Sequence, residues 1–149
     1  MRNFGAHLGK QLRAGDYLVL NGQLGAGKTT FTQGLGKGLN VAGTVTSTTF
    51  VVSRIHKATG NNPELIHIDA YRLENPEQLL DLDLEDHPNS VVVMEWGSSF
   101  IGALSDEWLE INIERTSDIS HDDPASGDRV VEIKAFGDRW KEIDLSEWS

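Results

Sequence analysis

Residues 22–29 have the sequence Gly22-Gln23-Leu24-Gly25-Ala26-Gly27-Lys28-Thr29, which matches the Walker A pattern G-x-x-x-x-G-K-(S/T) at every fixed position. Glycine adopts backbone angles that a side chain forbids, so such a loop can turn its N–H groups inward as an anion-binding nest. The pattern predicts that Lys28 reaches the β- and γ-phosphates of a nucleotide and that the Thr29 hydroxyl binds Mg²⁺. With the adjoining Thr30, residues 22–30 form the predicted nucleotide-binding segment.

The flanking segments agree with this prediction. Residues 16–20 are a short apolar run that favours a buried strand, and residues 30–39 place Phe31, Leu35 and Leu39 on one face of a helix. A phosphate-binding loop requires this order, because the positive end of the helix dipole then points at the phosphates. The alternative, a glycine-rich turn that binds nothing, is disfavoured by the complete pattern and by both flanks.

Composition indicates one compact domain over residues 1–149, since 38% of the residues are hydrophobic. The absence of cysteine excludes disulfides and thiolate metal sites. Neither a membrane-spanning run nor a signal-peptide pattern is present, so we expect a cytoplasmic protein. The formal net charge of −10 disfavours direct binding to nucleic acid, and we expect a partner protein to carry any role near RNA. The charge is equally consistent with a role in solubility alone.

The remaining chain alternates between predicted helices and strands. A helix is expected around Phe4, Leu8 and Leu12, a second from Asn75-Pro76 to about residue 86, and a short one after residue 137. Strands are expected at residues 51–56, 65–69, 90–96, 108–114 and 129–135. The strand at 90–96 is the most apolar, which is typical of the centre of a parallel sheet.

Two carboxylates, Asp69 and Glu95, end predicted apolar strands. Ligands bind at this edge of a doubly wound sheet, and phosphoryl transfer needs both a second Mg²⁺ ligand and a group that orients the nucleophile. Spacing leaves open which acid holds the metal. The five histidines lack ligand spacing, and we expect His67 to be a packed strand residue on the same sheet face as Asp69.

A hydroxyl-rich connector follows the Walker A helix at Thr46, Ser47, Thr48 and Thr49. In P-loop proteins a segment at this place often senses the γ-phosphate, so we name these four residues as a candidate switch. A plain strand edge is the open alternative.

Four blocks together resemble the TsaE (also called YjeE) P-loop ATPases of bacterial tRNA modification. Residues 22–31 resemble the family's G-D-L-G-A-G-K-T-T-F, and residues 46–50 resemble its switch segment S-P-T-F. Residues 67–73 resemble H-F-D-L-Y-R-L, and residues 95–96 match its E-W. The order of the blocks makes the resemblance more specific than a Walker A pattern alone.

The resemblance implies an α/β P-loop NTPase fold: a mostly parallel sheet, added antiparallel strands, and helices on both faces. It implies ATP and Mg²⁺ as cofactors, with Thr29 and Glu95 holding the metal. Asp69 becomes the catalytic acid or water-positioning group, acting with Lys28. Tyr71, Arg72 and Trp96 are secondary candidates.

Two partner proteins, TsaB and TsaD, are also implied by the resemblance. TsaD transfers a threonylcarbamoyl group to adenosine 37 of tRNA, and the ATPase, weak alone, supports turnover of the complex. tRNA would be reached only through that complex. A small-molecule kinase is the alternative, although no arginine-rich lid is visible, and a nucleotide-gated binding module without useful hydrolysis is a third.

The chain departs from the family pattern at three positions. Gln23 replaces an aspartate, and Thr48 and Gly97 replace prolines, so position 48 loses a fixed φ angle. Family members usually have several more residues before the first helix, and we expect the natural start to lie upstream of Met1.

Overall fold

The computed structural model describes residues 2–22, 27–41, 53–57, 59–70, 75, 84–98, 100–115 and 129–143. Several predictions fall outside these ranges. They concern loop residues 23–26, the candidate switch at 46–49, the secondary candidates Tyr71 and Arg72, and the predicted helix before residue 84. None of the described helices is long and apolar enough to cross a membrane.

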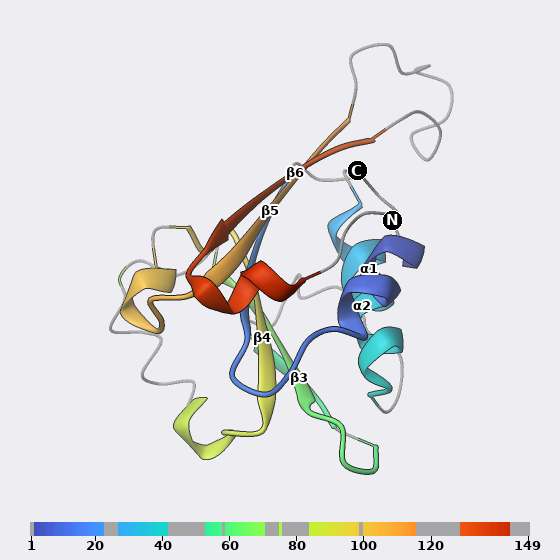
Figure 1. Ribbon diagram of the computed structural model, residues 1–149, viewed down its shortest axis with the longest axis vertical. Coiled ribbons are helices and arrows are strands. Elements are labelled where there is room, and N and C mark those ends of the chain that lie inside the picture. Colours follow the sequence, from blue (N-terminus) through green and yellow to red (C-terminus); the bar gives the residue numbers. More distant parts are fainter. Residues whose placement is uncertain are drawn as a thin grey trace.

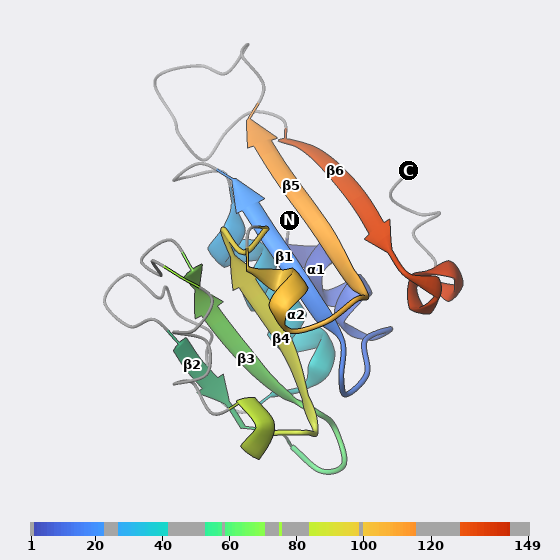
Figure 2. The same cartoon turned by 90° about the vertical axis from the view of Figure 1, so that its left-hand side faces the viewer.

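A six-stranded sheet with the order β2-β3-β4-β1-β5-β6 organises the chain (Figure 2). Its strands are β1 (Tyr17–Gly22), β2 (Ser53–His56), β3 (Glu64–Asp69), β4 (Ser90–Glu95), β5 (Trp108–Arg115) and β6 (Arg129–Phe136). The central four strands are parallel, and β2 and β6 add antiparallel edges. Every residue of β4 is buried, which confirms its predicted central place. The sheet confirms the predicted fold class.

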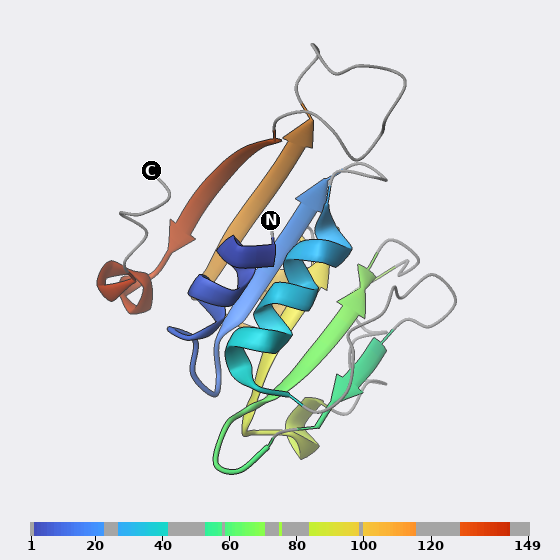
Figure 3. The same ribbon diagram turned by 90° about the vertical axis from the view of Figure 1, so that its right-hand side faces the viewer.

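Two α-helices, α1 (Arg2–Gly9) and α2 (Lys28–Leu39), lie side by side on one face of the sheet (Figure 3). Glycines allow this contact. A Cβ atom added at Gly34 would lie 2.2 Å from the Arg2 carbonyl oxygen, and one at Gly5 would lie 2.3 Å from that of Phe31. Glycine in a helix costs about 1 kcal/mol relative to alanine, but here it permits backbones to approach where a methyl group would clash.

The main core fills the space between these helices and the sheet. It includes Phe4, Leu8, Leu18, Leu20, Phe31, Leu35, Val91, Val93 and Ile111. The opposite face carries short 3₁₀ helices, η3 (Leu84–Asp86) and η4 (Ile101–Ala103), so helical segments occupy both faces as predicted (Figure 1). Leu84, Phe100 and Leu104 pack there against a second cluster around Ile66 and Met94.

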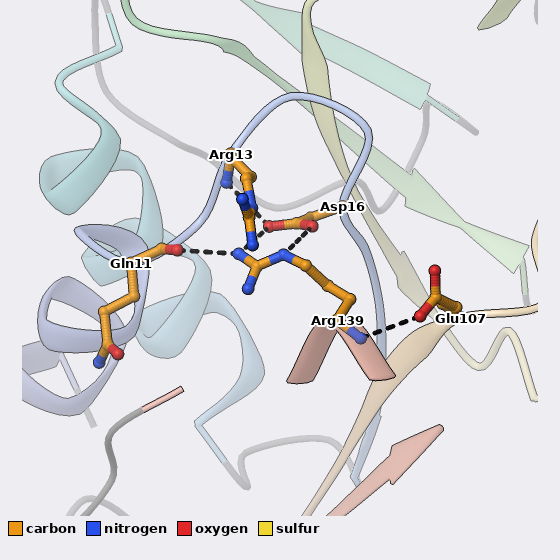
Figure 4. Close-up of polar contacts among 5 residues, drawn as sticks. All are labelled: Gln11, Arg13, Asp16, Glu107 and Arg139. Carbon is orange, nitrogen blue, oxygen red and sulfur yellow. Dashed lines mark hydrogen bonds and ion pairs between the residues drawn. The ribbon is translucent and has the colours of Figure 1, made fainter. Parts of the chain in front are cut away.

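A buried ion pair ties the 3₁₀ helix η5 (Asp138–Glu142) to the segment that enters β1 (Figure 4). The Arg139 guanidinium donates from Nε to Asp16 Oδ1 at 2.9 Å and from Nη2 to Oδ2 at 2.8 Å. Nη2 also donates to the Gln11 carbonyl at 3.0 Å, and the backbone N–H of Arg13 donates to Asp16 Oδ2 at 2.8 Å. The backbone N–H of Arg139 donates to Glu107 Oε2 at 2.9 Å. The chain before β1 is thus fixed to residues near the end of the described structure.

We predict that Arg139→Ala lowers the free energy of unfolding by about 3–5 kcal/mol, because it leaves the Asp16 carboxylate buried without its counter-charge. The Asp16 and Arg139 side chains are only 5% and 13% exposed. Urea denaturation measures the change. Lys141→Ala is the control in the same turn: its partner is Asp138, the two side chains are 77% and 90% exposed, and its loss should be below about 1 kcal/mol. Equal losses for the two variants would contradict this account of Arg139.

Candidate functional site

Strand register brings both predicted acids to the edge where the Walker A loop begins. Glu95 is paired with Leu20 of β1 on one side and with Asp69 of β3 on the other. The Trp96 N–H continues the ladder by donating to the Leu20 carbonyl at 3.0 Å. Gly22 ends β1 two residues after Leu20. The predicted carboxylates therefore lie at one sheet edge, beside the entry to the loop.

The second end of the loop is set by Gly27, the N-cap of α2. Its φ of 111° is a left-handed conformation that favours glycine, which is the physical reason for a glycine at this fixed position of the pattern. The helix begins at Lys28, two residues earlier than the predicted start at Thr30. Lys28 and Thr29 therefore lie in the first helical turn, where the helix dipole favours anions, and Thr30 is exposed.

Glu95 is contacted by two basic side chains. Lys28 Nζ lies 3.6 Å from Oε1, and His67 Nε2 lies 2.6 Å from Oε2. The three side chains are nearly buried, at 11%, 10% and 0% exposure for Lys28, Glu95 and His67. The structure thus brings together Lys28 and Glu95, which the sequence assigned to one site, and adds His67.

Trp96 completes the surroundings of the lysine. Lys28 Nζ lies 4.4 Å from the centroid of the Trp96 ring, within cation–π range. The tryptophan has a φ of 60°, a left-handed conformation that a non-glycine residue adopts at a cost of order 1–3 kcal/mol. Such strain is typical of functional sites. This contact places the secondary candidate Trp96 beside Lys28.

Asp69 differs from Glu95 in exposure. Glu95 is 8% exposed, whereas Asp69 is half-buried at the end of the neighbouring strand. Glu95, which ends the more apolar strand, is therefore the more buried of the two acids. Of the predicted nucleotide-binding residues, Gly22, Gly27, Lys28, Thr29 and Thr30 are described.

The expected packed position of His67 on the Asp69 face of the sheet is confirmed, but its contact with Glu95 was not predicted. Metal-ligand spacing was the criterion, and within the described ranges no group of three or more histidine and acidic side chains is placed to hold a metal. The usable signal was that His67 and Asp69 lie two residues apart in one strand, so their side chains share a face of the sheet. When β3 pairs with β4 in parallel, this shared face places His67 beside Glu95.

A second buried histidine, His56 of β2, lies on the same sheet face as His67. Burial lowers the pKa of His56 from its usual 6.5, and electrostatic repulsion from the neighbouring His67 and Arg54 side chains lowers that pKa further. The unfolded chain therefore binds this proton at higher pH than the folded chain. Stability attributable to His56 is complete above about pH 6.5 and is lost as the pH falls through the lowered value.

We predict that, as the pH is lowered, the free energy of unfolding falls less steeply for His56→Leu than for the unmodified chain. Urea denaturation between about pH 8 and about pH 5 gives the two slopes of unfolding free energy against pH. Equal slopes of unfolding free energy against pH for His56→Leu and the unmodified chain would show that His56 does not contribute to the pH dependence.

Comparisons with known proteins agree with these features. The family model described as "Threonylcarbamoyl adenosine biosynthesis protein TsaE" matches residues 1–122. The tRNA threonylcarbamoyladenosine biosynthesis protein TsaE of Streptomyces coelicolor is 45% identical over 148 residues, covering 98% of this chain and 97% of the relative. The TsaE protein of Bacillus subtilis is 36% identical over 129 residues, covering 87% and 75%.

A solved structure shows the same fold. The crystal structure of YdiB from Bacillus subtilis aligns with a TM-score of 0.67 at 30% sequence identity, covering 93% of this chain and 80% of that one. The sheet described above, the family match and the near full-length relative lead to one assignment. This chain belongs to the TsaE family of threonylcarbamoyl adenosine biosynthesis proteins.

Proposed function

We propose that this chain binds ATP with Mg²⁺ at the edge formed by α2, β3 and β4, and hydrolyses it slowly in support of tRNA threonylcarbamoyladenosine synthesis. The observation that carries the proposal is the 3.6 Å approach of Lys28 Nζ to Glu95 Oε1. A Walker A lysine and a strand-end carboxylate meet at the N-terminus of a helix, which is the arrangement that phosphoryl transfer to water uses.

The side chains present fit a magnesium ion. Mg²⁺ prefers oxygen ligands, keeps several waters, and is usually held by one or two protein groups together with phosphates. The Glu95 carboxylate and the Thr29 hydroxyl supply such oxygens, and they would hold the ion. When bound, Mg²⁺ neutralises charge that develops on the phosphates. The pairing of Glu95 with Lys28 supports this fit, since the carboxylate already faces a cation.

Lys28 then has two alternative anionic partners. Its ammonium group contacts both the Glu95 carboxylate and the Trp96 ring. The β- and γ-phosphates of a bound nucleotide would offer the lysine further charge-assisted hydrogen bonds, and the Glu95 carboxylate would then be available to hold the metal. Asp69, the more exposed acid beside Glu95, orients the attacking water.

The pathway and partners are part of the proposal. Relatives named for tRNA threonylcarbamoyladenosine biosynthesis support the pathway, and the TsaE family assignment supports TsaB and TsaD as partners. A net charge of −10 opposes direct binding to tRNA, so tRNA is reached through the complex. The partners also accelerate ATP hydrolysis by this chain. In slow ATPases a group such as an arginine finger raises the rate of hydrolysis by about 10³–10⁵-fold.

We predict that Lys28→Ala weakens Mg·ATP binding by roughly 1.5–3 kcal/mol, because it removes one charge-assisted contact to the phosphates. Isothermal titration calorimetry measures the affinity. Lys37→Ala removes an exposed lysine from the last turn of the same helix and should bind Mg·ATP normally. Unchanged affinity in Lys28→Ala would contradict the assignment of the site.

The two acids should have separable effects. We predict that Glu95→Gln weakens Mg²⁺-dependent nucleotide binding, because a carboxylate ligand is lost. Asp69→Asn should bind Mg·ATP normally and lose hydrolysis, because its carboxylate acts only on water. Calorimetry gives the affinities, and phosphate release with and without purified TsaB and TsaD gives the turnover.

These measurements also test the partners. Turnover of the unmodified chain should rise on addition of TsaB and TsaD. Turnover alone in the range of efficient kinases, roughly 1–100 per second, would contradict partner dependence. The opposite pattern in the two variants, with binding lost in Asp69→Asn and retained in Glu95→Gln, would reverse the two roles.

A further inference from the structure

We infer that His67 is a positioning residue, whose hydrogen bond fixes one carboxylate oxygen of Glu95 so that the other is presented to the metal. The inference rests on the proposed function, because its measurable consequence is the Mg²⁺ dependence of nucleotide binding. His67 is not proposed as a metal ligand.

The contact between the two residues is direct and sheltered from water. His67 Nε2 and Glu95 Oε2 are 2.6 Å apart, and the histidine side chain is fully buried. His67 is paired with Val93 of β4, so Glu95 lies two residues further along that strand and on the same face. Neighbouring parallel strands thus hold the two side chains in a diagonal cross-strand pair, and the sheet itself fixes their separation.

The surroundings of the imidazole identify which nitrogen carries the proton. Nε2 is at hydrogen-bonding distance from a carboxylate oxygen, so it donates. Within the described part of the chain, the buried Nδ1 has no hydrogen-bond partner. A proton on Nδ1 would be a buried N–H donor without an acceptor, which is an unfavourable arrangement. A ring proton on Nε2 avoids that arrangement and makes His67 a donor to Glu95.

This bond restricts the carboxylate of Glu95. With Oε2 held by His67, Oε1 is the oxygen at the lysine end of the site, 3.6 Å from Lys28 Nζ. When the lysine moves to the phosphates, the histidine remains as a partner of the carboxylate. Mg²⁺ requires near-octahedral geometry, and losing a group that orients a ligand typically costs 10–100-fold in metal affinity.

The test is calorimetric titration of ATP at a series of Mg²⁺ concentrations. We expect His67→Leu to raise the Mg²⁺ concentration for half-maximal binding by about 10–100-fold, with ATP binding in EDTA unchanged. His67→Gln places an amide N–H₂ near the position of Nε2 and should recover most of the loss. His56→Leu is the matched control, because it removes a buried histidine from the adjacent strand, on the same sheet face, and should leave the Mg²⁺ dependence unchanged.

Each outcome separates the inference from the function on which it rests. If the unmodified chain shows no Mg²⁺-dependent ATP binding, the proposed function fails. If it binds but His67→Leu keeps the same Mg²⁺ dependence, or weakens ATP binding equally in EDTA, the inference is wrong and the function stands.

A second measurement covers the case in which His67→Leu does not fold. His67→Gln must then bind with nearly unaltered Mg²⁺ dependence, and ¹⁵N NMR of the unmodified, nucleotide-free chain must show the His67 proton on Nε2. A proton on Nδ1 alone would overturn the inference.

Discussion

The parallel pairing of β1 with β4 determines the geometry of the whole site. It places Glu95 opposite Leu20, two residues before β1 ends at Gly22, and it continues through the hydrogen bond from the Trp96 N–H to the Leu20 carbonyl. A shift of register by one residue would turn the Glu95 side chain to the other face of the sheet. The Lys28–Glu95 contact depends on this register, and the His67–Glu95 contact depends on the neighbouring register of β3 with β4.

The rest of the fold holds β1 and α2 in place around that register. Glycines on α1 and α2 allow the two helices to approach closely, and the core beneath them fixes α2 on the sheet with Lys28 in its first turn. At the far end of β1, the buried Asp16–Arg139 pair anchors the strand entry. Stability and site geometry are therefore linked, because the elements that bury the core also position Lys28 beside Glu95.

Much of this could be predicted from sequence, since short-range patterns specify it. The apolar run of β4, the glycine at position 27 and the strand-end acids each follow from local chemistry. What sequence could not supply was the pairing of strands distant in the chain, on which the His67–Glu95 contact depends. The helix start was misplaced by two residues because the Walker A pattern was treated as loop up to Thr29, whereas Lys28 and Thr29 are helical. The Arg139–Asp16 pair, 123 residues apart in the chain, left no local signal.

The most direct measurement is a crystal structure with a non-hydrolysable ATP analogue and Mn²⁺, located by its anomalous scattering. We expect the metal on Glu95 and Thr29, the Lys28 ammonium on the phosphates, and His67 still bonded to Oε2 of Glu95. A metal bound by Asp69 while Lys28 remains paired with Glu95 would contradict this expectation.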